Sequence, residues 1–157
     1  MSKPTGGGEK LIALNRKARH FYELLDFLEA GLSLTGSEVK SLRQGMVNFK
    51  DGYVRLRNGT AALCGVHISP YKSASLMDQH DPERERPLLL HAHQIAAWQA
   101  KVEQKGLTVV PVRLYFKNGR VKLEIALAKG KNVHDRRDAL KERDLDREAA
   151  RERAAYK

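Results

Sequence analysis

Two clusters of cationic side chains have the residue types and spacing best suited to binding a charged partner. NRKARH, residues 15–20, places three cations, an amide and an imidazole within six positions. KGKNVHDRR, residues 129–137, places His134 among four cations. Such side chains donate hydrogen bonds to phosphate oxygens, which position a protein on nucleic acid without reading its bases. An imidazole ring can also stack on an exposed base.

Both clusters also have a plainer interpretation. Residues 15–20 could form a solvated surface strand, and His134 could sit on a solvated helix. In the distal tail, Arg143, Arg147 and Arg151 follow one another at intervals of four, beside a row of acidic residues. If this segment is helical, one ridge is positive. The spacing therefore suits either nucleic-acid binding or a solvated helix.

Patterns for catalysis or metal binding are weak. His91 and His93 form a His-x-His pair without an acidic or cysteine cluster, and on a helix they would point apart. The glycines at 6–8 are not followed by the remaining residues of a phosphate loop. Cys64 is the single cysteine, which excludes an internal disulfide and predicts a small buried hydrophobe. We therefore expect no enzyme activity, no metal and no cofactor.

The composition predicts an anionic partner. The chain has 157 residues, which suits one domain with an appendage, and carries a net charge of +10. Residues 1–128 hold 19 Lys and Arg against 12 Asp and Glu, and residues 129–157 hold 10 against 7. Both parts could touch one polyanion, although a basic protein need not bind nucleic acid. No stretch has the length of a membrane span or the apolar core of a signal peptide, so we expect a cytoplasmic protein.

Two Asn-Gly pairs predict β-hairpins, because Asn-Gly suits the type I′ turn that matches strand twist. They are Asn58-Gly59 and Asn118-Gly119. In the second hairpin, one face alternates apolar residues that we expect to be buried: Val110, Val112, Leu114, Phe116, Val121, Leu123, Ile125 and Leu127. The opposite face is basic and bears an aromatic ring: Arg113, Tyr115, Lys117, Arg120 and Lys122.

The remaining segments predict helices joined by loops. Residues 36–45 suit a short helix with Ser37 as its N-cap, and residues 88–106 suit a helix that ends at Gly106. Residues 69–87 are polar and rich in proline, which indicates a long surface loop.

Residues 20–34 are ambiguous. Phe21, Leu24, Leu25 and Leu28 have helical spacing, whereas a small β-barrel would require a strand there.

The last 29 residues, 129–157, have strong helix formers but no continuous apolar stripe. An isolated helix of this length is marginal in water. We therefore expect a tail that is disordered when free and helical when bound. The expected organisation is a flexible N-terminus at 1–10, a β-barrel domain at 11–128 and the tail at 129–157.

These segments together resemble the SsrA-binding protein family, small protein B (SmpB), the partner of transfer-messenger RNA in bacterial ribosome rescue. The resemblance runs from Leu14 into the tail. It is carried by NRKARHFYE, FLEAGLSLTGSEVKSLRQG, VNFKDGYVRLRNG, HISPY, HDPERERPLLL, GLTVVPVRLYFKNGRVKLEIALAKGK and HDRRDALKERD. It implies a mainly β protein with an oligonucleotide-binding-type antiparallel β-barrel and flanking helices. Residues 20–34 are then strand.

The resemblance implies that the body binds the tRNA-like domain of transfer-messenger RNA. The protein would help deliver that alanyl-charged RNA, with elongation factor Tu, to stalled ribosomes. The tail would enter the small-subunit decoding centre and the empty mRNA channel. Two alternatives are a ribosomal protein whose tail threads through ribosomal RNA and an RNA-modifying enzyme, which would need a cofactor pocket.

The resemblance also implies residue roles. Contacts to the tRNA-like domain are assigned to Asn15, Arg16, Lys17, Arg19, His20, Glu29, Leu89 and Lys122. Contacts of the tail with the ribosome are assigned to Lys129, Lys131, His134, Asp135, Arg136 and Arg137. A carboxylate repels phosphate, so Glu29 could instead hold a barrel turn or pair with a nearby cation. The sequence departs from the family at Asn132, which replaces a cation, and at Pro87, where lysine is common.

Overall fold

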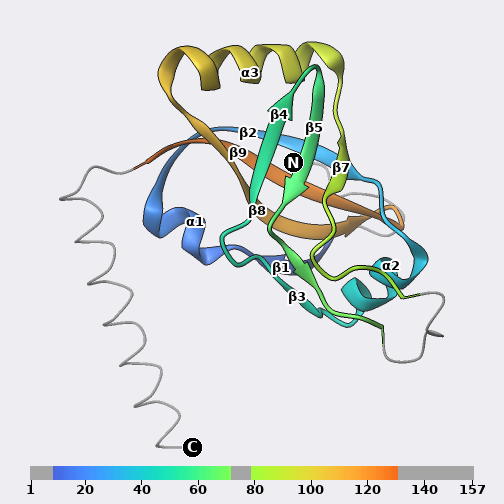
Figure 1. The fold of residues 1–157 in the computed structure, drawn as a ribbon. Coiled ribbons are helices and arrows are strands. Elements are labelled where there is room, and N and C mark those ends of the chain that lie inside the picture. The colour runs from blue at the N-terminus through green and yellow to red at the C-terminus, as the bar shows by residue number, and fades with distance from the viewer. Residues whose placement is uncertain (1–8, 72–78, 131–157) are drawn as a thin grey trace, which may run out of the picture.

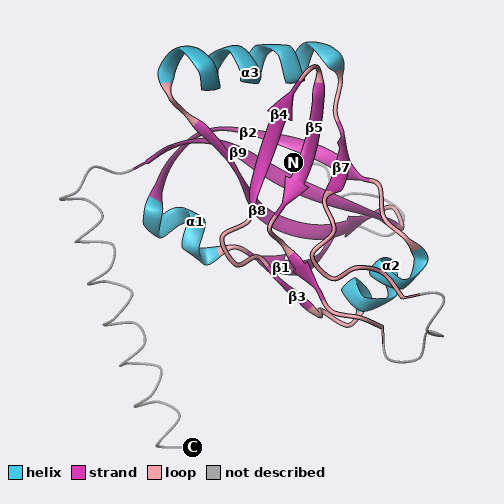
Figure 2. Cartoon of the chain, viewed as in Figure 1, coloured by secondary structure: helices cyan, strands magenta, loops and turns pink. Residues whose placement is uncertain are grey.

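The computed structural model describes residues 9–71 and 79–130 (Figure 1). The strands are β1 (Glu9–Leu14), β2 (Tyr22–Leu32), β3 (Val47–Asn48), β4 (Tyr53–Arg57), β5 (Thr60–Cys64), β6 (His67–Ile68), β7 (Arg86–Leu89), β8 (Thr108–Lys117) and β9 (Arg120–Gly130). The helices are α1 (Arg16–Phe21), α2 (Gly36–Arg43) and α3 (Ala92–Lys105). Figure 2 shows that strands dominate, which confirms the expected mainly β fold with flanking helices.

Both predicted ends differ from the structure at their boundaries. Glu9 and Lys10, expected to be flexible, begin β1. Lys129, expected in the tail, lies in β9 and pairs with Glu23 of β2. The remaining tail residues with predicted roles lie outside the described residues: Lys131, His134, Asp135, Arg136 and Arg137. The predicted change of the tail from disordered to helical also falls there.

The main sheet closes into an antiparallel barrel. Its order is β1-β8-β4-β5-β7-β2-β9, and β9 pairs again with β8. Strand β8 makes closure possible because it pairs with three strands. One edge of β8 pairs with β9. The other edge pairs with β4 at Val109 and with β1 from Arg113 to Lys117. The closed ring is therefore β8-β4-β5-β7-β2-β9, and β1 lies outside it.

The ring has the topology of an oligonucleotide-binding barrel with one added strand. Strands β4, β5, β7, β8 and β9 are its five strands in chain order, with α3 between the third and the fourth. Strand β2 is inserted between β7 and β9. Helix α3 lies across one end of the barrel and buries Ile95 and Trp98 in its core (Figure 1).

Both Asn-Gly turns have the predicted geometry. Asn58 and Gly59 have φ of 51° and 73°, and Asn118 and Gly119 have φ of 52° and 76°. Positive φ at both central residues defines the type I′ turn. The turns join β4 to β5 and β8 to β9 in antiparallel register. Both predicted hairpins are confirmed.

Most of the ambiguous segment forms strand β2, whereas His20 and Phe21 end helix α1. The helical spacing of the leucines is therefore misleading. The strand pairs with β9 along most of its length and with β7 at its end. A bulge between Leu24 and Asp26 changes which face the side chains occupy. Leu24 packs outside the barrel and Leu28 inside it, while Leu25 is exposed. The apparent helical stripe is therefore distributed over two faces of a strand.

A second bulge corrects the predicted face of β8. The register shifts between Pro111 and Arg113, so Leu114 faces the main core whereas Val110 and Val112 pack in a separate outer cluster beneath α1. Proline has no N–H to give to a ladder, which suits this break. The returning strand matches its prediction throughout. Val121, Leu123, Ile125 and Leu127 all belong to the main core.

Helix termini confirm one prediction and correct two. Gly106 has φ of 64° and ends α3 in the left-handed conformation, as expected. Helix α2 is capped by Thr35 rather than Ser37, and the Thr35 hydroxyl accepts the Glu38 N–H in a capping box. Leu88 and Leu89 belong to β7 rather than to α3. Cys64 is buried in β5, as predicted.

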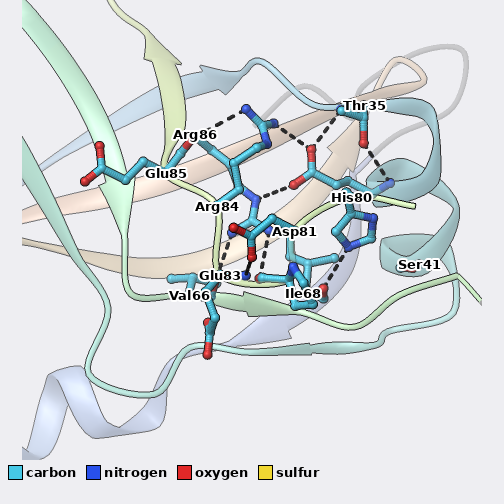
Figure 3. Close-up of polar contacts among 12 residues, drawn as sticks. Thr35, Ser41, Val66, Ile68, His80, Asp81, Glu83, Arg84, Glu85 and Arg86 are labelled. Carbon is cyan, nitrogen blue, oxygen red and sulfur yellow. Dashed lines mark hydrogen bonds and ion pairs between the residues drawn. The ribbon is translucent and has the colours of Figure 1, made fainter. Parts of the chain in front are cut away.

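A buried ion pair anchors the segment that the sequence suggested was a surface loop. Arg86 is fully buried, and its Nε donates to Glu38 Oε2 at 2.5 Å (Figure 3). Its other nitrogens donate to the carbonyl oxygens of Val66 and Pro82. Arg84 donates to Glu38 Oε1 at 2.6 Å. The end of this segment is therefore packed against α2 and β6 rather than solvated.

His80 strengthens the same attachment. Its Nδ1 lies 2.8 Å from the Ser37 hydroxyl, and its Nε2 lies 2.8 Å from the carbonyl oxygen of Ile68. The imidazole is buried and connects α2 with β6 (Figure 3). One ring nitrogen must donate to the carbonyl, because a carbonyl oxygen can only accept.

We predict that Glu38→Gln lowers the free energy of unfolding by about 3 kcal/mol, because it leaves Arg86 buried without its counterion. Burial raises the pKa of the Glu38 carboxyl, but hydrogen bonds from Arg84, Thr35 and Arg86 outweigh burial and hold that pKa below 4.5. The carboxylate therefore stabilises the fold at neutral pH, and this contribution is lost as pH falls below about 4.5. In urea unfolding between pH 3 and 7, the free energy of unfolding should fall less with decreasing pH in the variant than in the parent protein.

Glu83→Gln is the matched control. Glu83 pairs with Lys50 at the surface, and exposed pairs contribute at most about 1 kcal/mol. Equal losses of stability in the two variants would contradict an anchoring role for Glu38.

Candidate nucleic-acid interface

A cleft of about 610 Å³ opens where four strands of the barrel meet the start of α3. Its lining comes from β2, β5, β7, β9, the β4–β5 turn and α3: Glu29, Gly31, Gly59, Thr60, Ala61, Pro87, Leu88, Leu89, Leu90, His91, Gln94, Ile95 and Lys122. We call it the Lys122 cleft. In an oligonucleotide-binding barrel, nucleic acid binds on the face of strands two and three and on the loops that flank them. Here these strands are β5 and β7.

The cleft brings together three residues far apart in sequence. Gly31 of β2 pairs with Leu89 on one side and with Lys122 on the other, so all three lie in one row across three strands. Leu89 is 63% exposed although it is a large apolar side chain. A Cβ at Gly31 would lie 3.2 Å from the Leu89 Cβ, so a glycine there leaves room for this leucine. Glu29, Leu89 and Lys122 therefore line one surface.

Glu29 is held by neighbours on the barrel. The Tyr115 hydroxyl donates to Glu29 Oε2 at 2.5 Å, and Lys117 Nζ lies 3.3 Å from the same oxygen. Burial raises the pKa of Glu29, but the hydrogen bond from Tyr115 and the charge of Lys117 outweigh it and lower that pKa below 4.5. Glu29 therefore pairs with a nearby cation, as one interpretation of the sequence expected, and its contact with RNA stays a prediction.

The outer face of β8 and β9 is less basic than its sequence suggests. Tyr115 is buried to 2% exposure rather than presented to solvent. The Arg113 guanidinium lies 4.2 Å from the centre of its ring and forms ion pairs with Glu9 and Glu124. Lys117 is paired with Glu29. Carboxylates from three strands thus neutralise two of the expected cations.

Lys122 differs from those cations. Within the described residues it forms no ion pair, and it lies on the cleft wall beside Gly31. Of the cations predicted for this face, Lys122 lines the cleft, whereas Arg113, Lys117 and Arg120 do not. Pro87 also lines the cleft, at a position where the family commonly has lysine, so this departure removes a positive charge from the lining.

Residues 15–20 form a separate basic surface, on helix α1 rather than on a strand. Arg16, Lys17 and Arg19 are exposed, while Ala18 packs on the outer cluster beneath the helix. None of these residues lines the Lys122 cleft. The predicted contacts to the tRNA-like domain therefore divide between two surfaces.

Asn15 has a structural task at the start of α1. It is buried, and its side-chain amide donates to the Pro111 carbonyl oxygen at 2.8 Å. Its backbone N–H donates to the carbonyl oxygen of Val112. These hydrogen bonds satisfy two backbone carbonyl oxygens at the bulge of β8 and fix the position of the helix. His20, at the other end of the helix, is half-buried.

Lys129 lies apart from both surfaces. It lines a cavity of about 480 Å³ together with Lys101 and Lys105 of α3. The Lys122 cleft also contains residues that sequence reasoning did not propose, chiefly Thr60, Gln94 and His91. The hairpin at Asn58-Gly59 was the one signal that could have indicated Thr60.

The prediction that His91 and His93 would point apart on a helix was wrong. The rings of His91 and His93 stack, with centroids 5.5 Å apart and planes inclined by 13°. His91 precedes the helix with extended backbone, so helical spacing does not apply to it. Its N–H donates to the Gln94 side chain. In the described part of the chain, no group of three or more His, Cys, Asp or Glu could hold a metal.

Within residues 9–71 and 79–130, no helix has the length and apolar composition needed to span a membrane. The barrel topology and the cleft over β5 and β7 place the chain in the class of small oligonucleotide-binding-type barrels.

Comparison with known proteins identifies the family within that class. Residues 12–155 match the SmpB protein family. The SsrA-binding protein of Solidesulfovibrio magneticus is 66% identical over 149 residues, covering 95% of this chain and 96% of that protein. That of Trichodesmium erythraeum is 51% identical over 144 residues, covering 92% of each. The chain therefore belongs to the SmpB, or SsrA-binding protein, family.

A solved structure agrees with this assignment. A chain from a structure described as "tmRNA-SmpB: a journey to the center of the bacterial ribosome" matches with a TM-score of 0.67 and 43% identity. The match covers 82% of this chain and 93% of that one. The expected family and its barrel fold are confirmed.

We predict that Tyr115→Phe raises the pKa of Glu29 toward its ordinary value, because the variant removes the hydrogen bond that most favours the carboxylate. Carbon-13 NMR titration of the glutamate carboxyls would measure the change. Lys122→Ala is the control, because Lys122 acts on Glu29 only through its charge and has the smallest of the effects that lower this pKa. A larger shift in the control than in Tyr115→Phe would contradict this account.

Proposed function

We propose that this protein binds the tRNA-like domain of transfer-messenger RNA and helps bring that RNA to stalled ribosomes. The observation that carries the proposal is the match over residues 12–155 to a family whose solved member is described with tmRNA and the bacterial ribosome. The location of the Lys122 cleft, over the nucleic-acid face of the barrel, supports it. Its relatives in Solidesulfovibrio magneticus and Trichodesmium erythraeum are SsrA-binding proteins, and no observation favours a ribosomal protein.

In this proposal the Lys122 cleft binds the structured RNA. Lys122 contacts a phosphate, and the exposed Leu89 packs on a sugar or base. Glu29 organises the cleft through Tyr115 and Lys117. Helix α1 presents Arg16, Lys17, Arg19 and His20 to RNA, and Asn15 holds that helix in place.

The tail would act at a later step. We propose that residues 131–157 enter the decoding centre and the empty mRNA channel, folding into a helix as ribosomal phosphates neutralise their cations. His134 would contact an exposed base, with Lys131, Arg136 and Arg137 on phosphates and Asp135 beside them. Elongation factor Tu would join the delivery complex in the cytoplasm. The protein would act by binding rather than by catalysis.

We predict that Lys122→Ala weakens binding to the isolated tRNA-like domain by about 1 kcal/mol, roughly fivefold, and lowers the salt slope of affinity by about one. Lys122 points away from the core, so its removal opens no cavity. Fluorescence anisotropy at several salt concentrations would measure both quantities. Lys105→Ala, at the other end of α3, removes the same charge and should leave both unchanged. If the variant also unfolded at a clearly lower temperature, the weaker binding would reflect a structural role of Lys122 instead.

We predict that a chain ending at Gly130 keeps most of its affinity for the tRNA-like domain but no longer supports tagging of stalled peptides. The end point retains all of β9, which closes the barrel against β2. Binding assays and a reconstituted tagging reaction would separate the two activities. Tagging at the full-length level by the truncated chain would contradict the division of labour. His134→Ala in the full chain should impair tagging without weakening binding.

A further inference from the structure

The outer face of β4 carries three large side chains beyond the Lys122 cleft. Tyr53, Arg55 and Arg57 occupy alternate positions, and Val54 between them is buried in the core. We call these three residues the β4 strip. Their cross-strand partners on β5 are all small: Cys64, Ala62 and Thr60. Small neighbours leave the large side chains accessible from outside the barrel.

The side chains of Tyr53 and Arg57 are exposed, although Tyr53 forms a hydrogen bond with Cys64 and the charge of Arg57 acts on Glu85. The Tyr53 residue is 45% exposed, which is unusual for a large aromatic side chain on a regular strand. Arg57 is exposed and makes no ion pair within the described residues. Its backbone is nevertheless fixed, because the Thr60 hydroxyl donates to the Arg57 carbonyl oxygen at 2.6 Å across the type I′ turn.

Arg55 is different, because its charge is used internally. Two of its nitrogens donate to the two carboxylate oxygens of Glu85, each at 2.8 Å. This pair neutralises the Glu85 carboxylate beside the strip. Arg57 is therefore the net positive charge on this face, and the exposed ring of Tyr53 lies on the same strand.

The β4 strip borders the cleft across a single strand. Arg57 pairs with Thr60, and Arg55 pairs with Ala62, which in turn pairs with Pro87. Thr60 and Pro87 both line the Lys122 cleft. Adjacent strands lie about 4.8 Å apart, so a strand of RNA leaving the cleft over β5 would reach β4 within one nucleotide.

We propose that the β4 strip is a second contact surface for the RNA held in the Lys122 cleft. Tyr53 stacks on an unpaired base, and Arg57 binds a phosphate of the same strand. Exposed aromatic rings beside cations are the usual platform for single-stranded nucleic acid. An unpaired loop is the element expected here, because bases inside an A-form helix do not offer their faces for stacking. The inference rests on the proposed function and extends its interface across β5.

The test uses the full chain and a transcript of the tRNA-like domain. Tyr53→Leu should weaken binding about tenfold, whereas Tyr53→Phe should bind like the parent, because stacking needs the ring and not the hydroxyl. Arg57→Gln should weaken binding and lower the salt slope by about one. Arg43→Gln, an exposed arginine at the end of α2, removes the same charge and should change neither.

A second measurement does not depend on the stability of the variants. RNA carrying 4-thiouridine at its unpaired positions should crosslink, in the parent protein, to the peptide that contains Tyr53. Absence of this crosslink, or unchanged affinity in both Tyr53→Leu and Arg57→Gln while Lys122→Ala still weakens binding, would overturn the β4 strip alone. Unchanged affinity in all three variants would contradict the proposed function itself.

Discussion

The buried ion pair between Glu38 and Arg86 is the interaction on which the rest of the barrel depends. Strand β7 joins β5 to β2, yet it has only two registered pairs on each side. Arg86 supplements this short ladder by bonding to Glu38 of α2 and to the carbonyl oxygens of Val66 and Pro82. Strand β7 is what closes the ring between β5 and β2. The same strand presents Leu89 to the Lys122 cleft, so a contact in the core also positions the surface.

Closure on the other side relies on an irregular strand. Strand β8 pairs with three neighbours, and the bulge at Pro111 allows it to serve two hydrophobic clusters on opposite faces. Asn15 satisfies the carbonyl oxygen that the bulge exposes. Helix α1 is thereby attached to the outside of the barrel, and its cations form a surface distinct from the cleft. The bulge and the Asn15 contact thus hold the cations of α1 on a surface separate from the cleft.

Whether a surface cation is free to bind a phosphate depends on the carboxylates beside it rather than on the net charge of the chain. The chain is strongly basic, yet Arg113, Lys117 and Arg55 are paired with carboxylates on neighbouring strands. Lys122 and Arg57 form no ion pair within residues 9–71 and 79–130, so they remain for a polyanion. Electrostatic attraction over a distance follows net charge, whereas contact with a phosphate requires an unpaired donor at the right position. The proposed interface is therefore narrower than the basic composition suggests.

The sequence by itself determined the hairpins, the end of α3 and the family, because Asn-Gly turns and a left-handed glycine depend on one or two residues and family motifs are local. It could not decide β2, where Leu24 and Leu28 follow a helical spacing that a bulge reverses. It also placed Arg86 in a surface loop, because its partner Glu38 is 48 residues away. Burial of Tyr115 and neutralisation of Arg113 likewise depend on strands brought together from distant parts of the chain. Tertiary structure decided these features because pairing and burial are properties of neighbours in space, which a local pattern does not contain.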